Sequence, residues 1–289
     1  MPAYDTIAAS GHKMKTILCI AGPTASGKSA RAVGEALKRG GEIISVDSRQ
    51  VYRRCDIGTE KTTVEEQCGV PHYLIDIREP KDAYSAGDFV QDAEKLIDDI
   101  SARGKLPILV GGTHFYFHAL LIGLPNEVMP DLILREKLEK MSTEELYADI
   151  IARDPRRATE LDPKNRRRLV RAIEIIESKG AVSERIPKKH NYAVEWVVIN
   201  PPQEELRPKM DLRLKIAFDR GLIDEVERIR EEVGDVRLNE LGLEYKIVGE
   251  YLQGERTKES LLPTLSSRLW QYARRQKAWL RKLKDEQII

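Results

Sequence analysis

One stretch near the N-terminus, Gly22-Pro23-Thr24-Ala25-Ser26-Gly27-Lys28-Ser29, fits the phosphate-loop pattern G-x-x-x-x-G-K-[ST] at every fixed position. An apolar run at 16–21 precedes it, and a helix-forming stretch at 30–39 follows it. In such a loop, backbone N–H groups and a helix N-terminus bind phosphate oxygens. The Lys28 ammonium would add a positive charge, and the Ser29 hydroxyl would be a ligand for Mg²⁺. The stretch therefore predicts a site for a di- or triphosphate, with a chance glycine turn as the alternative.

A carboxylate follows the second apolar run of the chain. Asp47 comes directly after 42–46, and in a parallel sheet it would lie at the same edge as the phosphate loop. Such an acid could hold Mg²⁺ through water, accept a proton from a substrate as a general base, or cap the following turn. The local residue pattern leaves these three roles open.

Two clusters of basic residues are superimposed on a nearly neutral chain, which has 48 basic and 47 acidic residues. Eight basic and three acidic residues lie between Arg153 and Arg171, and seven basic and no acidic residues lie between Arg268 and Lys284. The second cluster is interleaved with Trp270, Tyr272 and Trp279. Basic side chains mixed with aromatic ones suit phosphate contacts and stacking on unpaired RNA bases. The alternative is a solvated basic helix face.

The histidines and cysteines give weaker signals. His114 and His118 are four residues apart on an expected helix, a spacing that can chelate a metal, but no HExxH motif is present. We expect one of them to face the substrate or to pack in the core. The three cysteines show no CxxC spacing, so neither a zinc site nor a disulfide framework is expected, as suits a cytoplasmic protein.

The elements that must position these residues follow from hydrophobic patterning. Strands are expected at 16–21, 42–46, 73–77 and 107–110, and helices at 29–39, 86–103 and 114–122. This alternation predicts an α/β fold, namely a phosphate-loop NTPase-like parallel sheet flanked by helices. The run at 105–113 ends in a glycine turn at the edge of the sheet where ligands bind.

The composition changes after Gly123. Residues 126–180 are charged and helix-forming, which predicts a helical insertion domain, and 195–199 is expected to return to the sheet as a strand before helices at 203–219, 221–232, 243–253 and 257–284. The expected organisation is a loose leader at 1–14, a catalytic core at 15–123 and 191–289, and the insertion at 124–190. No apolar run approaches the roughly 18 residues of a membrane span, and the leader lacks the apolar region of a signal peptide. We expect a monomer.

Taken together, these segments resemble the bacterial tRNA dimethylallyltransferases, also called tRNA isopentenyltransferases. The matching segments are 22–29, 47–52, 56–59 with Lys61, 69–76, 84–89, 107–113, 168–174, 221–226, and 271–276 with Trp279. The combination of Asp47-Ser48-Arg49-Gln50-Val51-Tyr52 with this phosphate loop is highly specific. The resemblance runs nearly from end to end of the chain.

The resemblance implies transfer of a dimethylallyl group from dimethylallyl diphosphate to N6 of adenine 37, next to the anticodon of tRNAs that read codons beginning with U. Asp47 would accept the proton of the amine, because an exocyclic adenine amine is a poor nucleophile. The phosphate loop, Lys28 and Mg²⁺ would stabilise the departing diphosphate, so the loop would not hydrolyse ATP. The adenine would have to be flipped out of the anticodon loop.

The resemblance also assigns residues by position. The implied catalytic residues are Asp47, Thr113 and Lys28. Diphosphate would be bound by Gly22, Thr24, Ala25, Ser26, Gly27, Lys28, Ser29 and Arg213, with Ser29 as the Mg²⁺ ligand. The tRNA anticodon stem-loop would contact Asp47, Ser48, Arg49, Gln50, Thr113, Arg135, Arg167, Arg168, Arg171, Gln271, Arg274 and Arg275.

Some positions depart from the family pattern. His114-Phe115 replaces a usual Gly-Leu, Lys209 replaces a usual arginine, and Glu60 occupies the place of a usual alanine. These departures concern substrate affinity, because none falls on Lys28, Asp47 or Thr113. Two other enzyme classes stay as alternatives, a prenyltransferase acting on free AMP and a small-molecule phosphate-loop kinase.

Overall fold

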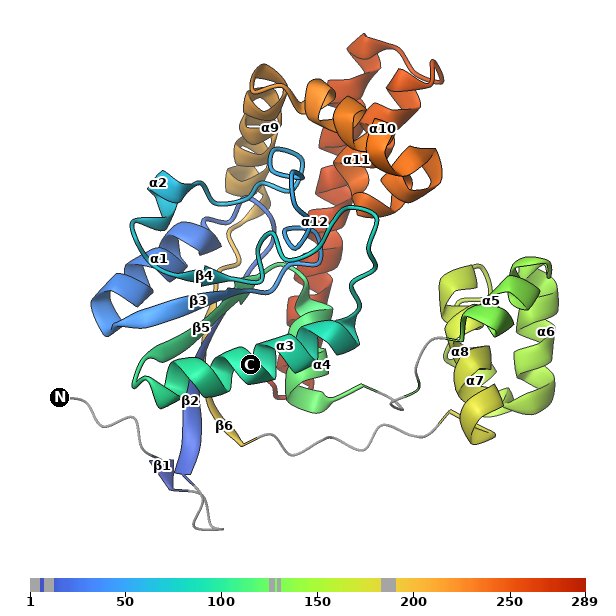
Figure 1. The fold of residues 1–289 in the computed structure, drawn as a ribbon, viewed down its shortest axis with the longest axis horizontal. Coiled ribbons are helices and arrows are strands. Elements are labelled where there is room, and N and C mark those ends of the chain that lie inside the picture. The colour runs from blue at the N-terminus through green and yellow to red at the C-terminus, as the bar shows by residue number, and fades with distance from the viewer. Residues whose placement is uncertain (1–5, 8–12, 125–127, 129–130, 183–190) are drawn as a thin grey trace. The chain divides into compact units, whose positions relative to one another are not determined.

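The computed structural model describes residues 6–7, 13–124, 128, 131–182 and 191–289. The chain divides into two compact units, Met1–Leu121 with His190–Ile289 and Ile122–Lys189. We call them the core unit and the insertion unit (Figure 1). Each unit has its own cluster of buried hydrophobic residues.

A parallel sheet forms the centre of the core unit, which confirms the predicted fold class. Its strands are β2 (Lys13–Ala21), β3 (Gly41–Ser45), β4 (His72–Tyr73), β5 (Leu106–Gly111) and β6 (Tyr192–Val198). Their spatial order is β6-β2-β5-β3-β4, and every neighbouring pair is parallel. The two-residue strand β1 (Thr6–Ile7) pairs antiparallel with the start of β2 and falls within the segment expected as a leader.

Alternate residues of the strands are buried on opposite faces of the sheet. Ile17, Cys19 and Leu109 belong to the large cluster that includes residues of helices α3 and α4, whereas Leu18 and Ile108 pack with buried residues of α1. Burial on both faces explains why the strands read as continuous apolar runs instead of alternating ones. Both faces of the central strands are therefore covered by helices (Figure 1).

The helices agree closely with the predicted ranges. The core unit contains α1 (Lys28–Arg39), α2 (Val64–Gln67), α3 (Ala86–Ala102), α4 (His114–Ile122), α9 (Gln203–Asp219), α10 (Leu222–Leu241), α11 (Leu243–Leu252), the 3₁₀ turn η1 (Lys258–Ser260) and α12 (Leu261–Asp285). Ser85 and Asp88 form a capping box that starts α3, as their spacing of three residues favours. None of the described helices is long and apolar enough to cross a membrane.

Two predicted ranges differ most from the structure, and backbone conformation gives the reason. The strand expected at 73–77 stops at Tyr73, because Leu74 and Asp76 have left-handed φ values of 62° and 56°. The helix expected at 221–232 extends to Leu241 as α10, across a non-helical Gly234 with φ 73° and ψ 169°. Side-chain periodicity does not reveal either change.

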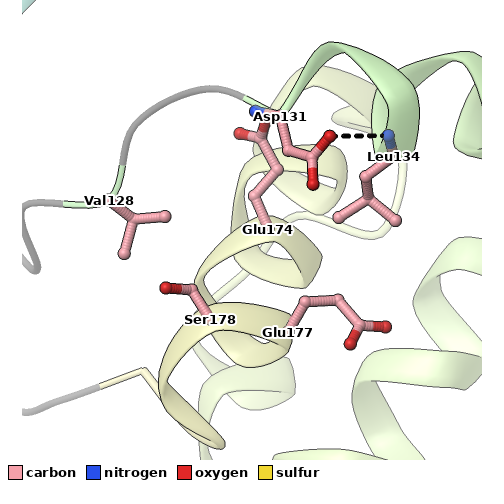
Figure 2. A pocket seen from close by; sticks show the side chains of 6 residues that line it. All are labelled: Val128, Asp131, Leu134, Glu174, Glu177 and Ser178. Carbon is pink, nitrogen blue, oxygen red and sulfur yellow. Dashed lines mark hydrogen bonds between the residues drawn. The ribbon is translucent and has the colours of Figure 1, made fainter.

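The insertion unit is helical, with α5 (Leu132–Glu139), α6 (Thr143–Arg153), α7 (Pro155–Thr159) and α8 (Arg166–Lys179). The Asp131 carboxylate accepts a hydrogen bond from the Leu134 amide and so starts α5 (Figure 2). A cavity of about 310 Å³ in this unit is lined by Val128, Asp131, Leu134, Glu174, Glu177 and Ser178. None of the predicted catalytic or diphosphate-binding residues lines this cavity.

Candidate active site

The phosphate loop connects the end of β2 to the start of α1. The loop can turn back on itself because Ala25 and Gly27 have left-handed φ values of 60° and 82°. A Cβ on Gly22 would lie 2.6 Å from the Ile199 carbonyl oxygen, so only glycine fits there. The buried Ser26 hydroxyl has no hydrogen-bond partner among the described residues. The loop thus holds an unpaired polar atom beside a helix N-terminus, as an anion site requires.

A buried glutamine from α12 ties this loop to the glycine turn after β5. The Gln276 Oε1 atom accepts a hydrogen bond from the Thr24 amide at 2.9 Å, and its Nε2 atom donates to the Gly112 carbonyl at 2.9 Å. A Cβ on Gly112 would lie 2.4 Å from that Nε2 atom. Gln276 therefore positions the phosphate loop relative to Thr113. It lies within a segment used for the family resemblance, but no role was predicted for it.

Asp47 and Thr113 come together because the ends of β3 and β5 are in close contact. A Cβ on Gly111 would lie 2.0 Å from the Val46 carbonyl oxygen. The Thr113 amide donates to that same oxygen at 3.2 Å, and the Ser48 amide donates to the Thr113 hydroxyl at 3.1 Å. Asp47, Ser48 and Thr113, three predicted site residues, are thus adjacent.

The two carboxylate oxygens of Asp47 have different surroundings. Its Oδ1 atom accepts hydrogen bonds from the amides of Arg49 and Gln50, at 2.8 and 3.3 Å. Its Oδ2 atom accepts none from the residues that the structure describes. The turn-capping role is therefore real, and it orients the side chain while leaving one oxygen available to a substrate. Capping and general-base catalysis are compatible here.

Arg213 on α9 meets the loop through Glu60. One guanidinium nitrogen of Arg213 lies 2.5 Å from Glu60 Oε2, which also accepts a hydrogen bond from the Thr24 hydroxyl at 3.0 Å. The Glu60 carboxylate thus joins Thr24 and Arg213, two predicted diphosphate ligands. In the sequence, Glu60 was noted only because it replaces an alanine that is usual in the family.

The charges of the site are coupled to one another. Burial lowers the pKa of Lys28, against the opposing effect of the negative charges of Asp47 and Glu60. Burial raises the pKa of Glu244 to about 8, with the charges of Glu60 and Asp47 adding to the effect. Desolvation of its hydroxyl raises the pKa of Tyr272, and Asp47 contributes again. Glu244, to which no role was assigned, and Tyr272, which was considered only for base stacking, therefore belong to the electrostatic surroundings of Asp47.

A buried carboxylate clamps the loop that carries Glu60. Glu225 of α10 accepts hydrogen bonds from the amides of Asp56, Ile57 and Gly58, all at 2.8–2.9 Å, and from the Tyr245 hydroxyl at 2.7 Å. A carboxylate that receives four donors in the interior rigidifies its surroundings. The clamp joins 56–59 to 221–226, two of the segments that carry the family resemblance.

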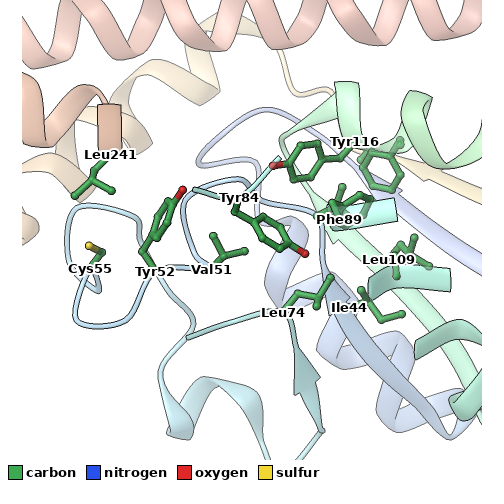
Figure 3. Packing of buried hydrophobic residues seen from close by; sticks show 14 of the residues in the cluster. Ile44, Val51, Tyr52, Cys55, Leu74, Tyr84, Phe89, Leu109, Tyr116 and Leu241 are labelled. Carbon is green, nitrogen blue, oxygen red and sulfur yellow. The ribbon is translucent and has the colours of Figure 1, made fainter. Parts of the chain in front are cut away.

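The hydrophobic cluster beneath these loops anchors the chain that follows Asp47. Val51, Tyr52 and Cys55 belong to the same cluster of buried residues as Leu109 of β5 and Leu241 of α10 (Figure 3). Packing from several elements leaves the Asp47 turn little freedom.

Gln50 was expected to contact tRNA, and the structure gives its side chain protein partners. Its Oε1 atom accepts from the Ser45 hydroxyl at 2.9 Å, and its Nε2 atom donates to the carbonyls of Thr59 and Glu60 at 3.3 and 3.2 Å. Gln50 thus links β3 to the loop of Glu60.

The two histidines of α4 lie in different surroundings. No group of three or more potential metal ligands exists among the described residues. His118 is buried and lies 3.3 Å from Glu286, whereas His114 is buried close to Lys28. Burial and the Lys28 charge lower the pKa of His114 to about 4. His114 is therefore neutral at physiological pH and packs in the core, one of the two expected outcomes.

The aromatic residues interleaved with the basic cluster of α12 differ in exposure. Gln271, Arg274 and Arg275 are exposed. Trp279 packs against Phe115, with ring centroids 6.1 Å apart. Trp270 packs against the cluster that contains Ala25, and Tyr272 is 37% exposed. Of the three aromatic residues considered for base stacking, Tyr272 is the one that the helix presents to solvent.

The predicted tRNA contacts of the insertion unit fall into two groups. Arg135 and Arg171 both pair with the buried Glu174, at 2.7 and 3.0 Å. Arg167 and Arg168 are exposed, and their side chains form no ion pair with the part of the chain that the structure describes. The second pair is thus available for phosphate contacts, whereas Arg135 and Arg171 also stabilise α5 against α8.

Comparisons with known proteins agree with this geometry. The family model described as IPP transferase matches residues 50–283. The chain is 38% identical over 284 residues to the tRNA dimethylallyltransferase of Thermomicrobium roseum, covering 95% of this chain and 86% of the relative. It is 40% identical over 281 residues to that of a Roseiflexus species, covering 93% and 91% of the two chains.

Solved structures give the same result. A tRNA isopentenylpyrophosphate transferase from Bacillus halodurans is 35% identical, with a TM-score of 0.69 over 92% of this chain and 87% of that one. A eukaryotic dimethylallyltransferase acting on tRNA is 29% identical, with a TM-score of 0.79 over 92% of this chain and 70% of that one. The predicted resemblance is confirmed: the chain belongs to the IPP transferase family.

Proposed function

We propose that this protein transfers a dimethylallyl group from dimethylallyl diphosphate to N6 of adenine 37 in tRNA, giving N6-dimethylallyladenosine. The observation that carries the proposal is the geometry of Asp47. One of its oxygens is held by two backbone amides and the other is unpaired among the described residues, beside Thr113 and near Lys28. A carboxylate oriented in this way is suited to accept a proton from a weak nucleophile.

The diphosphate would lie against the phosphate loop. Lys28, the N-terminus of α1 and Arg213 supply positive charge, and the buried Ser26 hydroxyl supplies an unpaired polar group. As the bond between the allylic carbon and oxygen breaks, negative charge collects on the leaving diphosphate. Preorganised donors and cations stabilise that charge without further reorganisation.

The acceptor amine would reach the site from the side of Asp47 and Thr113. Asp47 Oδ2 would take the proton as the carbon–nitrogen bond forms, and the Thr113 hydroxyl, held by the Ser48 amide, would position the reacting nitrogen. The base must leave its stack to enter, at a cost of a few kcal/mol. The exposed Arg274 and Arg275 of α12, with Arg167 and Arg168 of the insertion unit, would bind the phosphates of the anticodon stem-loop.

The residues present fit a Mg²⁺ ion. Mg²⁺ typically takes one or two protein ligands together with substrate phosphate oxygens, and the Ser29 hydroxyl at the start of α1 is the proposed protein ligand. When bound, the ion would neutralise part of the diphosphate charge. We place the reaction in the cytoplasm, where tRNA is found, and propose that a monomer carries it out.

The test combines purified protein, dimethylallyl diphosphate, Mg²⁺ and unmodified tRNA, followed by nucleoside analysis of the digested tRNA. We expect N6-dimethylallyladenosine at a single position. Asp47→Asn is the matched variant, because its side-chain oxygen can still accept from the Arg49 and Gln50 amides but is no longer a base. We expect about a 10²–10⁴-fold lower rate in this variant.

Parallel reactions with AMP and with ATP distinguish the two other enzyme classes. Prenylation of AMP without prenylation of tRNA would refute the proposed substrate. Consumption of ATP without prenyl transfer would indicate a kinase. An Asp47→Asn variant with full activity would remove the base from the mechanism.

A further inference from the structure

The centre of the diphosphate site contains a negative charge. Glu60 Oε2 lies 2.5 Å from the Arg213 guanidinium and accepts a hydrogen bond from the Thr24 hydroxyl at 3.0 Å. The side chains of Glu60 and Arg213 are 32% and 39% exposed, so both are reachable by a ligand. A carboxylate here opposes an incoming anion, because like charges at close range repel.

The backbone that carries Glu60 is held in place. Its carbonyl oxygen accepts from Gln50 Nε2 at 3.2 Å, its amide donates to the Ile57 carbonyl at 3.2 Å, and its φ is 55°. The Glu225 carboxylate holds the preceding amides of the same loop. Arg213, in contrast, is a long side chain on the helix α9, and it can turn without any change of backbone. Arg213 has the longer side chain, so its guanidinium can reach further from its Cα than the Glu60 carboxylate can.

We infer that Arg213 changes its ion-pair partner during the reaction. It pairs with Glu60 before the diphosphate binds, pairs with the diphosphate while that is bound, and pairs with Glu60 again when the diphosphate leaves. This inference rests on the proposed function and deepens it. Its consequence is that Glu60 weakens diphosphate binding and so favours release of the product. Because a half-exposed ion pair contributes little, we expect an effect of about fivefold on affinity.

Calorimetric titration of inorganic pyrophosphate with Mg²⁺ tests the inference without catalysis. Glu60→Gln removes the charge but keeps the size of the side chain and an acceptor for Thr24, and it should bind pyrophosphate about fivefold more tightly than the unchanged protein. Arg213→Met removes the shared cation and should bind more weakly. In the Arg213→Met background, Glu60→Gln should tighten binding by a smaller factor than in the unchanged protein, because only the direct repulsion between Glu60 and the anion then remains.

Each result has a definite meaning. No tightening in Glu60→Gln overturns the inference, and so does equal tightening with and without Arg213, which would show general charge repulsion. If the unchanged protein binds neither pyrophosphate nor dimethylallyl diphosphate, the proposed function itself fails. Circular dichroism of each variant shows whether the fold is kept.

Discussion

Replacing Gln276 by leucine should loosen the phosphate loop and destabilise the core unit. Gln276 is 4% exposed and makes two hydrogen bonds of 2.9 Å, with the Thr24 amide and the Gly112 carbonyl. Leucine has a similar volume but leaves both backbone groups without their partner. Each unpaired buried group costs about 1–3 kcal/mol, and Thr24 is only half-buried, so we expect a loss of about 2–4 kcal/mol.

Urea denaturation followed by tryptophan fluorescence measures this loss. The chain has three tryptophans, Trp196, Trp270 and Trp279, and all lie in the core unit, so the signal reports on that unit. Hydrogen exchange gives a local measure, because the Thr24 amide should exchange faster in Gln276→Leu.

Two further variants complete this experiment. Gln271→Leu changes an exposed glutamine of the same helix and should alter the free energy of unfolding by less than about 0.5 kcal/mol. Gln276→Glu can accept a hydrogen bond from the Thr24 amide, but at neutral pH it cannot donate to the Gly112 carbonyl. Its loss of stability relative to the unchanged protein should therefore be larger at pH 7 than below about pH 4, where the introduced carboxyl is protonated. A Gln276→Leu protein as stable as the control, with unchanged exchange at Thr24, would refute the positioning role.

Two other predictions concern pH and salt. Burial lowers the pKa of His114 to about 4. Between about pH 6.5 and pH 4, the unfolded chain therefore binds a proton at this histidine that the folded chain does not bind. The free energy of unfolding should fall as the pH falls through this range. His114→Gln should reduce the loss of unfolding free energy between pH 7 and 4 by about 3 kcal/mol in the same fluorescence assay, and an unchanged slope would contradict this origin. Replacing Arg274 and Arg275 by alanine should lower the slope of log K for tRNA binding against log salt by about 0.7 per lost contact, whereas the exposed Lys38→Ala of α1 should leave it unchanged. Equal slopes for the unchanged protein, the Arg274 and Arg275 variant and the Lys38 variant would show that this face of α12 is a solvated surface that does not contact tRNA phosphates.

Local signals were sufficient for most of the fold. The apolar runs predicted β2, β3, β5 and β6 because strands buried on both faces carry continuous hydrophobic residues. The strand expected at 73–77 was too long because left-handed residues such as Leu74 leave no trace in hydrophobic periodicity. The aromatic residues of α12 were similarly ambiguous, since only the fold decides which side of a helix is covered.

By itself, the sequence determined the chemistry that the chain can offer. The spacing of Gly22, Gly27, Lys28 and Ser29 is a local property, because a phosphate loop is built from consecutive residues. The position of Asp47 after a strand likewise placed it at the ligand-binding edge of the sheet.

The tertiary structure decided how these groups are held and which charges they meet. Gln276 is 252 residues from Thr24 in the chain, and Glu225 is 167 residues from Gly58, yet both pairs are hydrogen-bonded. The pairing of Arg213 with Glu60 also joins residues far apart in sequence. Such contacts depend on the packing of α9, α10 and α12 around the loops, and no local pattern encodes them. The sequence thus supplied the reacting groups, and long-range packing supplied their positions.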